Sequence, residues 1–145
     1  LWKKINRCDD YLVDLTDFSD PFMLFDDGET EDLLFIYLQT QGWYVIPNSR
    51  KADTMSYEFS LVHSKTGECA LIQVKTGHSE LNKDDDVYAK ISEKLFLFQS
   101  NELYKGAQYP HIECVSRDSL LKFMREYHHL LPGAMVNKAR LTGAI

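Results

Sequence analysis

"ALIQVKTGHSE", residues 70–80, sets an amide and an amine inside a stretch that otherwise has the apolar run of a buried strand. Successive side chains of a β-strand point to opposite faces of the sheet, so Gln73 and Lys75 share one face while Ile72 and Val74 share the other. Burying an amide or an amine costs free energy unless the group has a partner. We therefore expect the face that carries Gln73 and Lys75 to serve a functional site.

A hairpin is expected to join this strand to the one before it. The residues "HSKTG" (63–67) have the composition of a tight turn, and "YEFSLV" (57–62) alternates between two faces. The returning strand then covers residues 68–75. Antiparallel pairing of the two strands would present Glu58 on the same face as Gln73 and Lys75, close to both.

An amphipathic helix is expected before the hairpin, over residues 31–41. Acidic residues precede it, as suits the positive end of a helix, apolar residues follow at helical spacing, and Gly42 ends it. The residues "WYVIP" (43–47) then predict a short strand. Glu31 lies on the flank of the apolar stripe, so a helix packed on the sheet would aim it toward the same site.

The remaining pattern predicts an α/β protein with a central mixed β-sheet flanked by α-helices. We expect a helix over 84–94, strands at "LFLFQS" (95–100) and "HIECV" (111–115), and a helix over 116–129 that ends before Pro132-Gly133. The domain itself spans residues 27–131. An N-terminal extension, 1–26, would pack on its core, and residues 132–145 would form a C-terminal tail.

Composition limits the classes of protein that the chain can belong to. Its 145 residues, 44% hydrophobic and 26% charged, suit one soluble domain without an apolar run of the ~20 residues that cross a membrane. Three scattered cysteines predict a reducing, cytoplasmic setting. A net charge of -6 argues against nonspecific coating of nucleic acid. The chain begins at Leu1 without a signal peptide, which suggests a piece of a longer protein, and both monomer and homodimer stay open.

The polar residues gathered by the hairpin suit metal-dependent hydrolysis. Carboxylates, an amide oxygen and a backbone carbonyl form the hard oxygen shell that Mg²⁺ prefers, and Mn²⁺ is an alternative. A lysine beside such an ion orients an attacking water or stabilises the charge that grows on a phosphate. Glu31, Glu58, Gln73 and Lys75 are thus the groups needed to hydrolyse a phosphodiester.

The same residues give the chain a resemblance to the PD-(D/E)xK, or restriction-endonuclease-like, nuclease superfamily. "IQVK" resembles the QxK motif of Mrr-type restriction endonucleases, and the eleven-residue spacing from Glu31 to Gly42 is similar to theirs. The resemblance covers residues 27–100. It implies a restriction-endonuclease-like core with Glu58 as the metal-binding acid, Gln73 as the second ligand, Lys75 as the catalytic lysine and Glu31 as the helix acid. Asp53 is the rival to Glu58, because the family's strand acid is more often Asp.

The resemblance implies an endonuclease that hydrolyses DNA with Mg²⁺ or Mn²⁺, in a restriction, defence or mobile-element setting. Two alternatives stay open: a catalytically silent domain that binds nucleic acid or a partner protein, and an RNA-cleaving toxin or effector domain. Contacts to the phosphates of the nucleic acid are expected from basic residues around the site, namely Arg50, Lys51, Lys83, Lys90 and Lys94.

Overall fold

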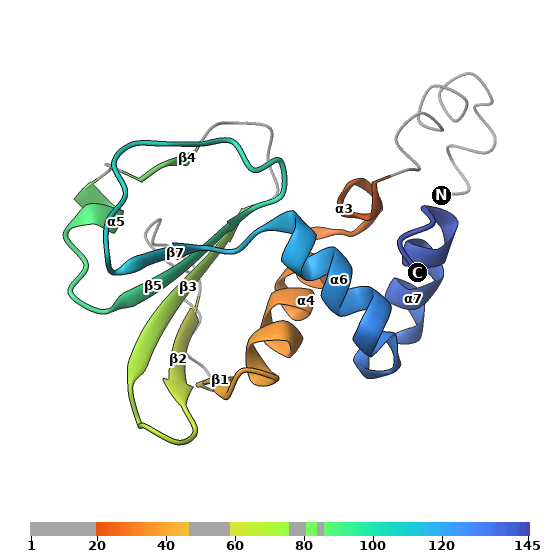
Figure 1. Ribbon diagram of the computed structural model, residues 1–145, viewed down its shortest axis with the longest axis horizontal. Coiled ribbons are helices and arrows are strands. Elements are labelled where there is room, and N and C mark those ends of the chain that lie inside the picture. The colour runs from red at the N-terminus through yellow and green to blue at the C-terminus, as the bar shows by residue number, and fades with distance from the viewer. Residues whose placement is uncertain (1–19, 47–58, 76–80, 84–85) are drawn as a thin grey trace.

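A five-stranded mixed sheet with helices packed on it forms the centre of the protein (Figure 1). The computed structural model describes residues 20–46, 59–75, 81–83 and 86–145. The strands lie in the order β1-β2-β3-β5-β7, with bounds Trp43–Val45, Phe59–His63, Cys69–Lys75, Lys94–Gln99 and Ile112–Cys114. The predicted α/β class and central mixed sheet are confirmed, and the strand that carries Gln73 and Lys75 is the middle one.

The sheet changes from antiparallel to parallel pairing at β3. β1 pairs with β2 and β2 with β3 in antiparallel register, whereas β5 lies parallel to β3 and β7 parallel to β5. The predicted hairpin is confirmed: the N–H of Gly67 donates to the carbonyl of His63 over 2.9 Å, and Phe59 pairs with Ile72. Of the residues between β3 and β5, Tyr88 packs on the face of the sheet that carries Leu71.

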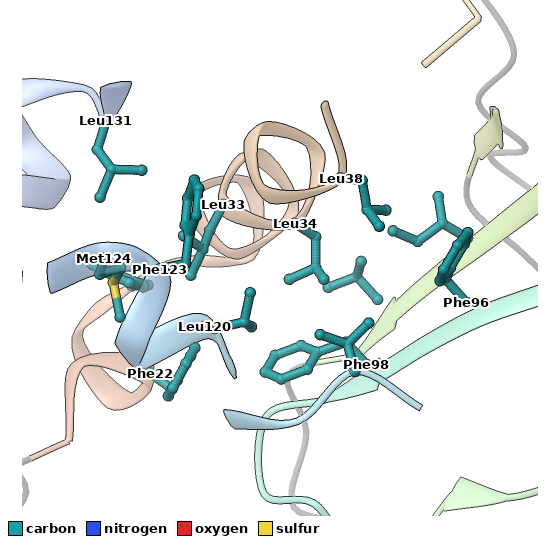
Figure 2. Packing of buried hydrophobic residues seen from close by; sticks show 14 of the residues in the cluster. Phe22, Leu33, Leu34, Leu38, Phe96, Phe98, Leu120, Phe123, Met124 and Leu131 are labelled. Atoms are coloured by element: carbon teal, nitrogen blue, oxygen red, sulfur yellow. The ribbon is translucent and has the colours of Figure 1, made fainter. Parts of the chain in front are cut away.

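The two faces of β3 enter different cores. Ile72 and Val74 belong to the larger core with Phe96 and Phe98 of β5, against which the helices of Figure 2 pack. Leu71 belongs to a smaller core on the opposite face, completed by side chains from β5, β7 and the short helix α5, Asp86–Ala89: Leu95, Leu97, Ile112 and Tyr88. The predicted separation of Ile72 and Val74 from the face of Gln73 and Lys75 is therefore confirmed.

The helix α4, Asp27–Gln39, covers the larger core. A capping box starts it, in which the Asp26 carboxylate accepts from the N–H of Glu29 and the Glu29 carboxylate accepts from the N–H of Asp26. The helix thus begins four residues before the predicted start at Glu31. The acidic residues that we expected before the helix form its N-cap and its first turn. Its buried side chains include Leu34 and Leu38, which point toward Phe98 and Phe96 of β5, and Leu33, which lies beside Phe123 on the other side of the helix (Figure 2).

Helices from both ends of the chain complete this layer. α3, Pro21–Leu24, buries Phe22 against Phe98, with ring centroids 5.5 Å apart. α6, Arg117–Tyr127, buries side chains on α4 and runs into a 3-10 turn, His128–Leu130. Residues 1–19 of the expected N-terminal extension lie outside the described residues.

Residues 133–141 form a helix, α7 (Gly133–Leu141), where we expected a C-terminal tail. Pro132 cannot continue α6, since proline lacks the amide N–H that helix interiors need, but it suits the residue that precedes a new helix. Met135 and Ala139 of α7 are buried in the larger core. Lys138 also forms an ion pair with Glu29 of α4, with 2.6 Å between Nζ and Oε1. The end of the chain is therefore part of the fold.

The helix predicted over 84–94 is wrong in extent, since α5 covers only Asp86–Ala89 and Lys94 already belongs to β5. Pairing decides this boundary: Lys94 and Leu95 lie opposite Ala70 and Leu71 in the parallel ladder, and a longer helix would break those pairs. A second small sheet was not expected from the sequence. Its parallel strands are β4, Leu81–Asn82, and β6, Tyr104–Lys105.

Gly42 joins α4 to β1 at a position that other residues fit poorly. Its φ is +94°, in the left-handed region, and a Cβ there would lie 2.7 Å from Nε2 of His63. The His63 ring is itself held, because Nε2 contacts the carbonyl of Gln41 at 3.1 Å and Nδ1 accepts from the N–H of Lys65 at 3.2 Å. The glycine that the sequence identified as the helix stop is thus also a packing requirement.

Gly42→Ala is expected to lower the free energy of unfolding by about 2–4 kcal/mol, since backbone strain and a steric clash add together. Gly67→Ala is the matched control, because its φ is +71° but a Cβ there meets nothing within 4 Å. The control should lose only the cost of the backbone conformation, about 1–2 kcal/mol. Urea denaturation measures both, and equal losses would contradict the clash with His63.

Candidate functional site

The candidate site lies where β3 ends. Gln73 is only 3% exposed, and Lys75, the last residue of β3, is half-buried. In the parallel ladder Gln73 lies opposite Leu97 and Lys75 lies opposite Gln99, so these side chains share one face of the sheet. The face is apolar where the two strands begin and polar where they end. The sequence prediction that Gln73 and Lys75 act together is consistent with this geometry.

Sequence reasoning missed two buried polar residues at the same end of the sheet. Gln99 is 1% exposed on the face of Lys75, and Ser100 follows it at 8% exposed. "LFLFQS" was interpreted only as a buried strand, although it ends an apolar run with an amide just as "LIQVK" does. The amide after the apolar run marks Gln99 as a polar residue in a buried strand, but its place opposite Lys75 follows only from the parallel pairing of β3 with β5. Ligands of open α/β sheets bind outside the carboxyl ends of parallel strands, which is where these residues lie.

Glu31 lies near the same end of the sheet as Lys75. It belongs to α4, however, which covers the face opposite to that of Gln73 and Lys75. α4 packs on the face of Ile72 and Val74, and its Phe35 ring lies 4.6 Å from the Phe59 ring of β2. Glu31 precedes Phe35 by one turn, which moves it about 6 Å toward the end of the sheet where Lys75 lies. The two groups therefore approach one end of the sheet from its two faces.

The acidic partners expected at the site lie outside the described residues. These are Glu58, which directly precedes Phe59 of β2, and its rival Asp53. Within the described ranges, no group of three or more His, Cys, Asp or Glu residues could hold a metal ion. Gln73 offers an amide oxygen near the end of β3, and Glu31 is the predicted acid that falls within the described residues.

The predicted nucleic-acid contacts are spread over the molecule. Lys94 begins β5, roughly 16 Å along the strand from Gln99. Its amine pairs with Glu113 over 3.3 Å and lies 5.0 Å from the centre of the Phe96 ring, at the end of the sheet away from Lys75. Lys83 donates to the Gln108 amide over 3.2 Å, and Lys90 is exposed just after α5. Arg50 and Lys51 lie outside the described residues.

Tyr104 packs against the smaller core, next to the polar end of the face that carries Lys75 and Gln99. Its hydroxyl accepts a hydrogen bond of 2.7 Å from the backbone N–H of Gln99, and its ring packs against the smaller core. Burial raises the pKa of the Tyr104 hydroxyl well above its ordinary value of 10.0. The hydroxyl therefore keeps its proton at pH values where an ordinary tyrosine ionises, and it holds the backbone of Gln99, the residue opposite Lys75.

Comparison of the chain with protein-family models, curated proteins and solved structures finds no match. No helix within the described ranges is long and apolar enough to span a membrane. The geometry at the end of β3 and the motifs in the sequence thus carry the functional argument.

Tyr104→Phe is expected to lower the free energy of unfolding by about 1–3 kcal/mol, because it leaves the buried N–H of Gln99 without its acceptor. Tyr127→Phe is the control, since Tyr127 is 41% exposed. Urea denaturation at pH 7 measures the difference. A loss no larger than that of the control would show that the hydrogen bond contributes nothing.

The raised pKa of Tyr104 also predicts a pH dependence. The unfolded chain releases the tyrosine proton near pH 10 while the folded protein keeps it, so the unfolded state binds fewer protons and stability falls as pH rises above 10. This part of the fall should disappear in Tyr104→Phe. Unfolding free energies at pH 8.5 and above pH 10, compared between wild type and variant, provide the measurement. Parallel pH profiles would contradict the assignment.

Proposed function

We propose that the protein is a metal-dependent nuclease of the restriction-endonuclease-like type that hydrolyses phosphodiester bonds in DNA. The observation that supports this function best is the placement of Gln73 and Lys75 together on one face at the carboxyl end of β3. The order of elements adds support, since an acid-bearing helix, the Gly42 stop, a strand and a hairpin precede the QxK strand. A restriction, defence or mobile-element role would follow from the resemblance.

The donors proposed for Mg²⁺ or Mn²⁺ are the amide oxygen of Gln73 and the carboxylate of Glu58 or Asp53, with Glu31 as a further acid. A buried amide oxygen fits the hard-oxygen preference of these ions. When bound, the ion would lower the pKa of a coordinated water and polarise the phosphate. The fit is partial within the described residues, because the strand acids lie outside them.

Lys75 would act on the reacting groups directly. A half-buried ammonium at the end of a strand interacts with a phosphate more strongly than one in bulk water, because the surrounding protein lowers the effective dielectric constant. There it would position the attacking water by hydrogen bonding and offset the negative charge that grows on the phosphate oxygens. Glu31, from the other face, would orient water or accept its proton.

A catalytically silent domain is the second candidate. It is favoured by the packing of α4, and with it Glu31, on the face away from Lys75. Such a domain would use the same end of the sheet to bind nucleic acid or a partner protein without cleaving it. Activity measurements on the wild-type protein separate the two candidates.

Lys75→Ala is expected to lower the rate of Mg²⁺-dependent cleavage of plasmid DNA by about 10²–10³-fold, because the charge that stabilises the transition state is lost. Lys65→Ala is the matched control, since Lys65 is an exposed lysine in the hairpin turn, and it should keep the wild-type rate within about twofold. Cleavage is followed on gels as supercoiled plasmid becomes nicked and linear. Equal rates in the two variants would exclude Lys75 from the chemistry.

Further variants decide which groups surround Lys75. Glu58→Gln and Asp53→Asn, assayed against increasing Mg²⁺, identify the metal-binding acid as the variant that needs more metal. Gln73→Ala should raise the Mg²⁺ requirement, and Glu31→Gln should slow cleavage. The same assays on structured RNA test the RNA-cleaving alternative. A wild-type protein that binds nucleic acid but cleaves neither substrate would support the silent domain.

A further inference from the structure

Arg117, the first residue of α6, joins several elements at the end of the sheet where Lys75 lies. Its Nη1 donates to the carbonyl of Ser100 over 2.6 Å, and its Nη2 lies 2.7 Å from a carboxylate oxygen of Asp20. The guanidinium carbon lies 4.8 Å from the centre of the Phe22 ring. The backbone N–H of Arg117 donates to the carboxylate of Glu102. One side chain thus ties α6 to the residues that follow β5 and precede α3.

Ser100 links Arg117 to the candidate site. The N–H of Ser100 donates to the carbonyl of Lys75 over 3.0 Å, one step beyond the last pair of the parallel ladder. Each of the two backbone groups of Ser100 is therefore held, its N–H by Lys75 and its carbonyl by Arg117. Ser100 is 8% exposed, so these bonds are largely shielded from water.

Lys75 needs such an anchor because it is the last residue of β3. Strand ends fray more readily than strand centres, since fewer hydrogen bonds hold them. The bond from Ser100 holds the peptide plane that follows Lys75, and the orientation of that plane helps to set the direction of its Cα–Cβ bond. A lateral shift of the strand end would move the amine with it.

Arginine suits this position better than lysine does. Its planar guanidinium directs separate N–H groups to a carbonyl and a carboxylate at once, whereas one ammonium cannot reach both with the same geometry. The carboxylate of Asp20 orients the guanidinium from its other side. The same carboxylate also caps α3 by accepting from the N–H of Phe22 over 3.0 Å. The side chains of Arg117 and Asp20 are about a quarter exposed, at 26% and 25%.

We propose that Arg117 is a positioning residue that holds Lys75 in place through Ser100. This proposal rests on the proposed nuclease function for its activity readout, but the physical link between Arg117 and the end of β3 can be measured without it. The competing explanation is that Arg117 only stabilises the packing of α6. That explanation predicts a loss of stability with no change in the end of β3 or in the cleavage step.

The test compares Arg117→Gln and Arg117→Lys with Arg125→Gln, an exposed arginine in the last turn of the same helix. Asp20→Asn is a milder variant, since it removes the charge that orients the guanidinium but keeps an oxygen that caps α3. Amide hydrogen exchange of Ser100 reports on the anchor, and the ¹³Cε NMR signal of Lys75 reports on its side chain. Single-turnover cleavage of plasmid at saturating Mg²⁺ and a DNA-binding titration report on function.

We expect Ser100 exchange to accelerate at least tenfold in Arg117→Gln and the Lys75 signal to shift, with Arg125→Gln unchanged. The cleavage rate of the folded Arg117→Gln protein should fall about 10- to 100-fold, because a small misplacement of a catalytic group lowers the rate by that much. Its DNA affinity should stay within twofold of wild type. Arg117→Lys and Asp20→Asn should fall between Arg117→Gln and wild type.

The outcomes separate the two proposals. Unchanged Ser100 exchange and an unchanged Lys75 signal in Arg117→Gln would overturn the positioning role whatever the activity. Faster Ser100 exchange in Arg117→Gln with an unaltered cleavage rate would also overturn the positioning role, but it would leave the nuclease function intact. Should the wild-type protein cleave nothing, the nuclease function fails, while faster exchange and a shifted Lys75 signal would still support the link from Arg117 to Lys75.

Discussion

The parallel pairing of β3 with β5 is the constraint on which the rest of the structure depends. Six residue pairs, from Ala70 with Lys94 to Lys75 with Gln99, join two strands whose central residues are buried on both faces. A strand buried on both faces needs a layer on each side. α4 and α6 supply one layer, and α5 with the segment around Tyr104 supplies the other. The mixed sheet follows because the β2–β3 hairpin adds antiparallel strands at one edge.

The candidate site follows from where that ladder ends. Leu71, Leu95 and Leu97 fill the face above α5, and polar side chains take over only in the last rows, at Gln73, Lys75 and Gln99. Burying these groups costs free energy that an apolar side chain would not. Their concentration at one end of two parallel strands, rather than along the face, is the pattern typical of a binding or catalytic site.

Local sequence patterns predicted much of this fold. They failed where contacts between distant parts of the chain determine the structure. The alternation around Gln73, the turn at His63–Gly67 and the helix stop at Gly42 depend on neighbours in sequence, and all three were predictable. The extent of α5 depends on pairing with Ala70, and α7 depends on a core that residues near Phe22 help to build. Gln99 and Arg117 were missed for the same reason: only the folded protein places Gln99 opposite Lys75 and Arg117 against Ser100. Glu58 and Asp53 stay predictions.

The packing of α7 has a consequence for how the protein is made. Glu29 and Lys138 are separated by 109 residues, and side chains from both neighbourhoods share one core. During synthesis at ~5–20 residues per second, Lys138 follows Glu29 after roughly 5–20 s. α4 can pack on β5 before α7 is made, whereas its ion pair with Lys138 and the part of the core that Met135 and Ala139 fill form only once this later segment is present.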